Sequence, residues 1–135
     1  MSAEILELKG LVCSGLDKAA GFTQMEWVMR EFRDKLGFAP YPGTLNLQMQ
    51  GASWERARRR LLAGKGIVIT PESGACGAKC FLLSLGDEVR GAAVFPEIDT
   101  YPVDKLEVVA PAHLRSALRI YDGDQISVRI DVSDY

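Results

Sequence analysis

One stretch near the carboxyl end decides the fold class: Ile126-Ser127-Val128-Arg129-Ile130-Asp131-Val132. Apolar and polar side chains alternate along it, and successive side chains of a strand point to opposite faces, so the pattern predicts a strand with one buried face. Short apolar stretches bounded by turn residues predict further strands at Ile67–Ile69, Cys80–Leu85, Val89–Phe95 and Leu106–Val109. The turn residues Gly86-Asp87 predict that the second and third of these form a hairpin.

Two helices are predicted in the first half of the chain. Thr23 and Glu26 have the spacing of a capping box, and the apolar residues that follow recur every three or four positions as far as Gly37. This pattern predicts a helix with one apolar face and a glycine stop. Ser53 is the expected N-cap of a second helix at Trp54–Leu62.

Two more strands and a short helical segment complete the pattern, at Ile5–Val12, Thr44–Met49 and Ala112–Leu118. Six or seven short strands with only two or three short helices indicate a mainly β fold. We expect a compact barrel, because a doubly wound parallel sheet would need more crossover helices.

The composition is that of one ordinary globular domain, which we expect to cover residues 1–135. Hydrophobic residues make up 47% of the chain and charged residues 25%, with a formal net charge of -2. Nucleic-acid binding by counterion release needs an excess of Lys and Arg, so we expect no nucleic-acid partner. Apolar runs are too short for a membrane span, and Glu4 and Glu7 stand where a leader would be basic and then apolar. With an odd number of cysteines, we expect a cytoplasmic protein with reduced thiols and no membrane partner.

A candidate metal site follows the proline-rich segment that ends at Gly43. Strand alternation places Thr44 and Asn46 on one face, so a hydroxyl and an amide oxygen lie two residues apart. Neutral oxygen ligands of this kind suit Mg²⁺ that also keeps water and nucleotide phosphate oxygens. The alternative is that Thr44 and Asn46 only fix the turn before the strand.

Two other segments could complete a site around this metal. Ser14-Gly15-Leu16 follows a predicted strand and precedes a predicted helix, which is the arrangement in which backbone amides hold phosphate groups. Glu107 is a carboxylate between apolar residues of a predicted strand, and a half-buried carboxylate there could act as a general base. The alternative for Glu107 is an outward-facing strand residue without a chemical role.

Three further features have a structural interpretation beside a functional one. His113 is the single histidine, and its setting is more typical of a surface or turn residue than of a catalyst. Cys76 and Cys80 have three residues between them, whereas a thioredoxin-like motif has two, which favours structural thiols over metal or redox chemistry. The basic run at Arg56 and Arg58–Arg60 is either a solvated helix face or a patch that binds phosphate or RNA.

Several segments together form a pattern that none of them shows alone. They are Gly10–Leu16, Leu36–Leu47, Gly91–Val94, Pro96, Leu106–Pro111, Leu114–Arg115 and Asp122–Asp124. Together they resemble the CTP-dependent riboflavin kinases, a family known mainly from archaea. The segments occur in the family's order and span most of the chain. Pro42-Gly43-Thr44-Leu45-Asn46 with its lead-in is specific to the family, whereas an Asp-Gly-Asp turn alone is common.

The resemblance implies a cradle-loop (RIFT-like) β-barrel of six strands and an enzyme of flavin cofactor biosynthesis. In such an enzyme the 5′-hydroxyl of riboflavin attacks the γ-phosphate of CTP, and the products are FMN and CDP. The resemblance implies that Thr44 and Asn46 hold Mg²⁺, and that Glu107 orients or deprotonates the ribityl hydroxyl. Thr100 would contact the flavin together with Glu107. The residues that would bind the nucleotide are Ser14, Gly15, Leu16, Asp17, Lys18, Ala19, Ala112, His113, Leu114 and Arg115.

One segment departs from the family's pattern. The family usually continues Ser-Gly-Leu with Gly-x-Gly, but this chain has Asp17-Lys18-Ala19-Ala20, where a methyl group at Ala19 obstructs the close approach of backbone to phosphate. The leading expectation is a kinase with CTP as its donor. The departure motivates an alternative, namely a non-catalytic homologue that binds flavin or nucleotide. A second alternative is a DNA-binding regulator on a related swapped-hairpin barrel, which shares the turn Asp122–Asp124 but is disfavoured by the acidic composition.

Overall fold

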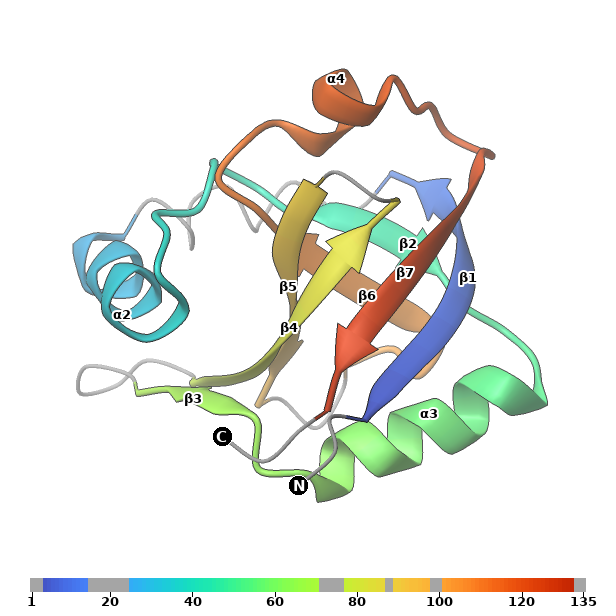
Figure 1. Ribbon diagram of the computed structural model, residues 1–135, viewed down its shortest axis with the longest axis horizontal. Helices are drawn as coiled ribbons and strands as arrows, with labels where there is room; N and C mark the ends of the chain where they lie inside the picture. Colours follow the sequence, from blue (N-terminus) through green and yellow to red (C-terminus); the bar gives the residue numbers. More distant parts are fainter. Residues whose placement is uncertain (1–3, 15–24, 71–76, 87–88, 98–100, 133–135) are drawn as a thin grey trace.

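The computed structural model describes residues 4–14, 25–70, 77–86, 89–97 and 101–132. Within these residues the chain forms the strands and helices that Figure 1 shows. The strands are β1 (Ile5–Cys13), β2 (Leu45–Gln48), β3 (Ile67–Ile69), β4 (Ala78–Leu85), β5 (Val89–Pro96), β6 (Lys105–Val109) and β7 (Gln125–Asp131). The helices are α2 (Glu26–Leu36), α3 (Ala52–Ala63) and α4 (Leu114–Leu118). None of these helices is long and apolar enough to cross a membrane.

Six of the strands close into an antiparallel barrel. Neighbouring strands follow the order β4-β5-β6-β2-β1-β7, and β7 pairs back with β4, where Leu83 is opposite Ile130. Each barrel strand therefore has a partner on both edges. β3 pairs with β4 and lies outside the closed ring. The mainly β barrel predicted from the sequence is confirmed, with one strand outside it and three helices around it.

Apolar side chains at alternating strand positions fill the interior of the barrel. Leu47, Leu106, Val108 and Ile130 are fully buried there, and burial of one such side chain stabilises the fold by roughly 1.5–3 kcal/mol. In Figure 1 the helices α3 and α4 lie on opposite sides of the barrel, and both add buried side chains to this core. The same alternation turns the intervening residues of β2 and β6 outward.

The helix α2 builds a second apolar cluster on the outside of the barrel. Trp27, Val28 and Phe32 of the helix pack with residues of β3, β4 and β5, among them Cys80. The helix ends at Gly37, whose φ of 86° lies in the left-handed region, and the Gly37 N–H donates to the Phe32 carbonyl at 3.1 Å. The predicted apolar face and glycine stop of this helix are confirmed.

The N-terminal ends of both longer helices differ from the prediction. Met25 is the N-cap of α2, and the predicted cap Thr23 lies outside the described residues. Gly51 is the N-cap of α3, so the prediction of Ser53 was wrong and this serine lies in the first turn. The cause is the backbone at Gly51, which has a φ of 95°. Glycine adopts this conformation at little cost, so the helix begins directly after Gly51.

Candidate active site

The polar side chains of β2 and β6 lie on the outer face of the barrel. The leucines of β2 point into the core, so Thr44, Asn46 and Gln48 share the opposite face. Asn46 lies directly opposite Glu107 of β6, and the next outward pair is Gln48 with Lys105. The structure therefore brings together the three residues of the predicted metal and acceptor site, which are Thr44, Asn46 and Glu107.

Hydroxyl groups hold both carboxylate oxygens of Glu107. Thr44 Oγ1 donates to Oε1 at 3.1 Å, and the Tyr101 hydroxyl donates to Oε2 at 2.8 Å. The Lys105 ammonium lies 3.8 Å from Oε1. The Glu107 side chain is only 14% exposed, so these contacts replace most of its water. Burial, followed by the neighbouring Glu107 charge, raises the pKa of the Tyr101 hydroxyl, which therefore stays protonated and donates.

Thr44 and Asn46 each carry a side-chain oxygen atom with lone pairs that no described hydrogen bond uses. Gly43, with a φ of 96°, turns the chain into β2 directly before Thr44. Because Thr44 donates its proton to Glu107, the lone pairs of Oγ1 remain for a ligand. Asn46 donates from Nδ2 to the Thr44 carbonyl at 3.3 Å, and its Oδ1 is buried with no hydrogen-bond partner among the described residues.

A bound cation would explain the unpartnered oxygen of Asn46. A buried acceptor without a partner costs roughly 1–3 kcal/mol, and native proteins seldom keep one without a reason. Mg²⁺ prefers oxygen ligands and keeps several of its waters, so it is usually bound through few protein atoms. The pair of neutral oxygens on Thr44 and Asn46 therefore fits this ion.

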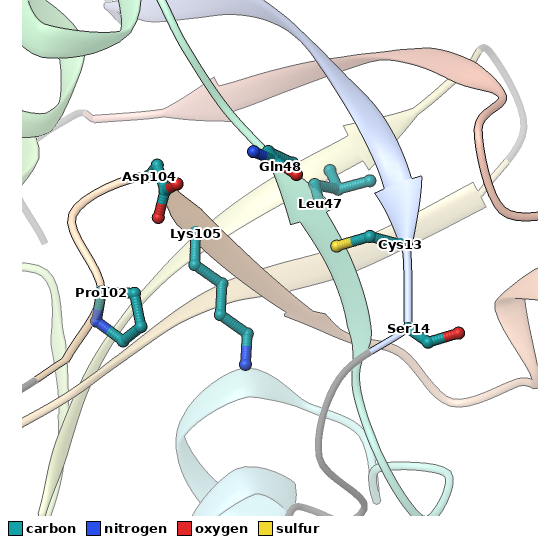
Figure 2. Close-up of a pocket in the computed structure, with 7 residues that line it drawn as sticks. All are labelled: Cys13, Ser14, Leu47, Gln48, Pro102, Asp104 and Lys105. Atoms are coloured by element: carbon teal, nitrogen blue, oxygen red, sulfur yellow. The ribbon is translucent and has the colours of Figure 1, made fainter.

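A pocket of about 260 Å³ opens next to Lys105, which stands two positions before Glu107 on β6 (Figure 2). Its walls are Cys13, Ser14, Leu47, Gln48, Pro102, Asp104 and Lys105. Figure 2 shows the Lys105 side chain and the Cys13 sulfur turned toward the same space. Burial, partly opposed by Lys105, raises the pKa of the Cys13 thiol, which therefore stays neutral. The pocket combines apolar surface with an ammonium, a carboxylate and an amide, which suits a planar ligand with polar edges.

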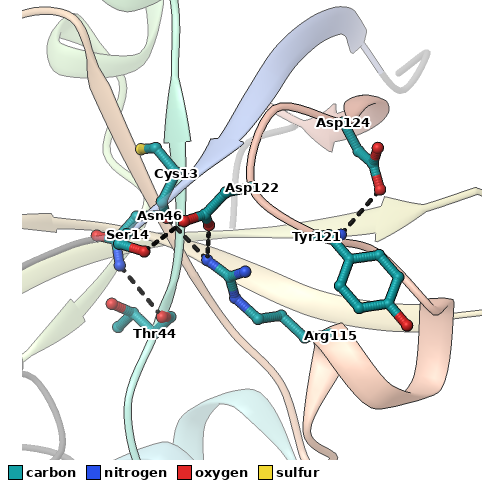
Figure 3. A network of polar contacts seen from close by, with 8 residues as sticks. All are labelled: Cys13, Ser14, Thr44, Asn46, Arg115, Tyr121, Asp122 and Asp124. Atoms are coloured by element: carbon teal, nitrogen blue, oxygen red, sulfur yellow. Dashed lines mark hydrogen bonds and ion pairs between the residues drawn. The ribbon is translucent and has the colours of Figure 1, made fainter.

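The two predicted nucleotide segments are linked through Asp122 (Figure 3). Ser14 Oγ donates to Asp122 Oδ2 at 2.7 Å, and Arg115 Nη2 donates to Oδ1 at 2.6 Å. Arg115 also donates to the carbonyl of Cys13 at 3.1 Å. The hydrogen bonds from Ser14 and then Arg115 hold the pKa of the Asp122 carboxyl below its usual value. The remaining predicted residues of the first segment, Gly15, Leu16, Asp17, Lys18 and Ala19, lie outside the described residues.

The other residues of the second nucleotide segment lie at the start of α4, which begins two positions later than predicted. Ala112 and His113 are exposed. His113 Nδ1 lies 2.6 Å from Ser116 Oγ, and its ring centroid is 5.2 Å from that of Tyr41. The Leu114 side chain is buried in the barrel core, so only its backbone can face a nucleotide.

The basic run of α3 borders a second pocket, which shares Asp104 with the first. Arg60 forms an ion pair with Glu4 at 2.9 Å. Arg58 and Arg59 line a second pocket of about 460 Å³ near the N-terminal end of α3, together with Trp54. The structure gives this run a place on the helix surface, and the described contacts do not join it to Glu107.

The predictions for the cysteines and for the flavin contact Thr100 differ in how far the structure describes these residues. Cys80 is fully buried, and burial raises the pKa of its thiol to about 12, which is the state of a structural thiol. Cys13 and Cys80 are free cysteines. Cys76 and Thr100 lie outside the described residues.

Sequence reasoning missed three residues of the site. Lys105 stands two positions before Glu107 on one strand, so alternation could have placed it on the same face. Tyr101 reaches Glu107 from the segment before β6, and Asp122 reaches Ser14 across 108 positions of sequence. Neither of these contacts leaves a periodic signal in the sequence.

The sequence matches known proteins over almost its whole length. Residues 12–130 match the family profile CTP-dep_RFKase, whose description reads "Domain of unknown function DUF120". Proteins named riboflavin kinase from Methanococcoides burtonii, Archaeoglobus fulgidus and Pyrobaculum calidifontis are 36%, 37% and 39% identical to this chain. Each alignment covers 93% of this chain, and they cover 57%, 54% and 60% of the relatives. The chain thus spans less than two thirds of the length of these relatives.

Proposed function

Because this chain belongs to the CTP-dependent riboflavin kinase family, we propose that it transfers the γ-phosphate of CTP to the 5′-hydroxyl of riboflavin and releases FMN and CDP. The observation that carries this proposal is the convergence of Thr44, Asn46 and Glu107 on one outward face of β2 and β6. Phosphoryl transfer asks a protein mainly for alignment and charge neutralisation, so a site without a covalent nucleophile is sufficient.

Glu107 acts on the acceptor alcohol in this proposal. Its carboxylate takes the proton of the 5′-hydroxyl while that oxygen forms a bond to the γ-phosphorus. The bond from the γ-phosphorus to the bridging oxygen breaks, and its electron pair leaves with CDP. Two hydroxyl donors fix the carboxylate, and an ionised carboxylate has lone pairs left for a third donor. The pocket beside Lys105 binds the flavin ring in this proposal. Thr100, the residue before Tyr101 in the sequence, is assigned to the flavin as well.

Thr44 and Asn46 would hold Mg²⁺ through Oγ1 and Oδ1. When bound, the ion would neutralise negative charge on the phosphate oxygens of CTP. The buried Oδ1 of Asn46, which no described donor reaches, supports this assignment.

The nucleotide lies at the end of β1 and the start of α4 in this proposal. The residues assigned to it are Ser14, Gly15, Leu16, Asp17, Lys18, Ala19, Ala112, His113, Leu114 and Arg115. Arg115 supplies a guanidinium near the end of β1. The charge of Asp17 opposes a polyphosphate and requires compensation by Lys18 or Mg²⁺. We place the reaction in the cytoplasm, which suits the free thiols of Cys13 and Cys80.

The test is incubation of the purified chain with riboflavin, Mg²⁺ and one nucleoside triphosphate at a time. We expect FMN and CDP in equal amounts with CTP, and no FMN when a chelator removes the divalent ion. FMN with another donor and not with CTP would keep the kinase and overturn the donor. Flavin binding without FMN under every donor would overturn the kinase and leave the non-catalytic homologue that the segment Asp17–Ala20 motivates.

A further inference from the structure

Asp122 lies between the two segments that we assign to the nucleotide. One of its carboxylate oxygens accepts from Ser14, where the predicted phosphate loop begins, and the other accepts from Arg115 of α4. Ser14 and Asp122 are 108 positions apart, and the two bonds are 2.7 and 2.6 Å long. One side chain therefore sets the separation of the two segments (Figure 3).

Hydrogen bonds that do not involve the Asp122 carboxylate fix the turn that carries Asp122. Gly123 N–H donates to the Val12 carbonyl and Val12 N–H donates to the Asp124 carbonyl, both at 2.8 Å. Asp124 Oδ2 accepts from the Tyr121 N–H, also at 2.8 Å. The first two bonds fasten the turn to β1 and the third closes the turn itself, so the Asp122 carboxylate is left for contacts with Ser14 and Arg115.

The contacts of Arg115 fix the direction of its guanidinium. Nη2 donates both to Asp122 and to the Cys13 carbonyl, while a guanidinium carries five N–H donors over three nitrogens. Held at one nitrogen, the planar group keeps a fixed orientation and retains donors for an anion. A positive group that is already oriented loses less entropy when it binds phosphate.

We propose that Asp122 is a positioning residue for the nucleotide, which holds Ser14 and the Arg115 guanidinium so that both meet the phosphates of CTP. This inference rests on the proposed function. The negative charge of Asp122 by itself opposes a polyphosphate, but Arg115 and Ser14 bind that charge. The benefit of Asp122 is the fixed geometry.

The test is calorimetric binding of CDP with Mg²⁺ to wild type, Asp122→Ala and Asp124→Ala. We expect Asp122→Ala to bind CDP about tenfold more weakly, because the charge-assisted bonds that orient Arg115 and Ser14 are lost. Asp124→Ala removes a carboxylate from the same turn that touches neither residue, so its affinity is expected to stay within about twofold of wild type. Thermal unfolding of both variants controls for a loosened turn.

Three further measurements separate positioning from a merely structural role. In steady state, Asp122→Ala is expected to raise the KM for CTP and leave the KM for riboflavin unchanged. Asp122→Asn keeps an acceptor for Arg115 and is expected to fall between wild type and Asp122→Ala; it also serves if the alanine variant does not fold. Because Asp122 acts in part through Arg115, the pair Arg115→Ala with Asp122→Ala is expected to lose less CDP affinity than the sum of the two single losses.

Several outcomes would overturn the assignment of Asp122. They are unchanged or tighter CDP binding by Asp122→Ala and Asp122→Asn, an equal loss in Asp124→Ala, or losses that add in the double variant. A wild-type chain that binds no CDP would overturn it as well. A wild-type chain that binds CDP and makes no FMN would overturn the kinase, while the binding series would still decide the role of Asp122.

Discussion

The two sides of the candidate site are built by different means. On the metal and acceptor side, Thr44, Asn46 and Glu107 stand on paired strands, and the register of β2 and β6 sets their spacing. On the nucleotide side, Ser14 and Arg115 follow a strand and open a short helix, and Asp122 joins them from a turn. The first side is positioned by backbone pairing, whereas the second depends on a few exposed side-chain bonds. Substitutions should therefore affect chemistry on the first side and nucleotide affinity on the second.

The largest effect is expected from removal of both neutral oxygens. Thr44→Val with Asn46→Leu deletes the proposed ligands of Mg²⁺ and keeps the side-chain volumes similar. We expect no FMN above background at any Mg²⁺ concentration, measured by chromatography of the flavins. Ser127→Val, at an exposed position of β7, is the matched control and should retain wild-type turnover.

The same double variant also separates a lost ligand from a lost fold. The double variant removes the unpartnered buried oxygen of Asn46, but it also loses the hydrogen bonds from Thr44 to Glu107 and from Asn46 to the Thr44 carbonyl. The free energy of unfolding is therefore expected to stay within about 2 kcal/mol of wild type. A double variant that turns over riboflavin normally would refute the metal assignment. One that is inactive because it no longer unfolds cooperatively would show that Thr44 and Asn46 act in folding.

Glu107→Gln is expected to have the next largest effect. A general base contributes roughly 10²–10⁴-fold, so turnover should fall by this factor while the KM for CTP changes little. Single-turnover FMN formation measures the chemical step directly. Glu97→Gln, an exposed residue outside the site, is the control. Turnover within a few-fold of wild type would show that Glu107 is not the base.

Tyr101→Phe should have a smaller effect that sharpens the role of Glu107. The change removes the 2.8 Å hydrogen bond to Oε2 and keeps the ring, and we expect kcat/KM for riboflavin to fall about tenfold. Tyr121→Phe is the matched control, since that ring is 72% exposed. An unchanged kcat/KM for riboflavin would contradict the proposed contact.

The smallest effect is expected on the nucleotide side, in the pH dependence of stability. The pKa of Asp122 is lowered from 3.8, first by Ser14 and then by Arg115. A lowered folded-state pKa adds stability above the unfolded-state value, and this contribution is lost as pH falls through the folded-state value. The difference in unfolding free energy between wild type and Asp122→Asn should therefore be constant near neutral pH and shrink below about pH 4. A difference that grows in acid would contradict the lowered pKa.

The contrast between the two sides also explains what the sequence could predict. Alternation in Ile126–Val132 and in the other apolar stretches predicted the barrel, because a strand with one buried face leaves a period of two. The same rule placed Thr44 and Asn46 on one face. Pairing of β2 with β6 then set Asn46 opposite Glu107, and this pairing is a property of the folded chain.

The rest of the fold and of the site lacks a local signal that could be interpreted correctly from the sequence. Ser53 looked like a helix cap, but the backbone conformation of Gly51 decided where α3 begins. Tyr101 and Asp122 act through hydrogen bonds that form only when distant segments meet. Turn and loop residues of this kind carry no period, so tertiary contacts alone reveal them.

The most direct test of the central claim is paramagnetic broadening by Mn²⁺, which takes the place of Mg²⁺, in the nuclear magnetic resonance spectrum of the isotope-labelled chain with CDP present. If β2 carries the cation site, the side-chain amide signal of Asn46 should broaden first in the wild-type chain, while the signals of Asp124 and Asp131 stay unchanged. In the Thr44→Val variant the Asn46 signal should not broaden. Early broadening at Asp124 or Asp131, with the Asn46 signal still sharp, would contradict the claim that Thr44, Asn46 and Glu107 form the reaction centre.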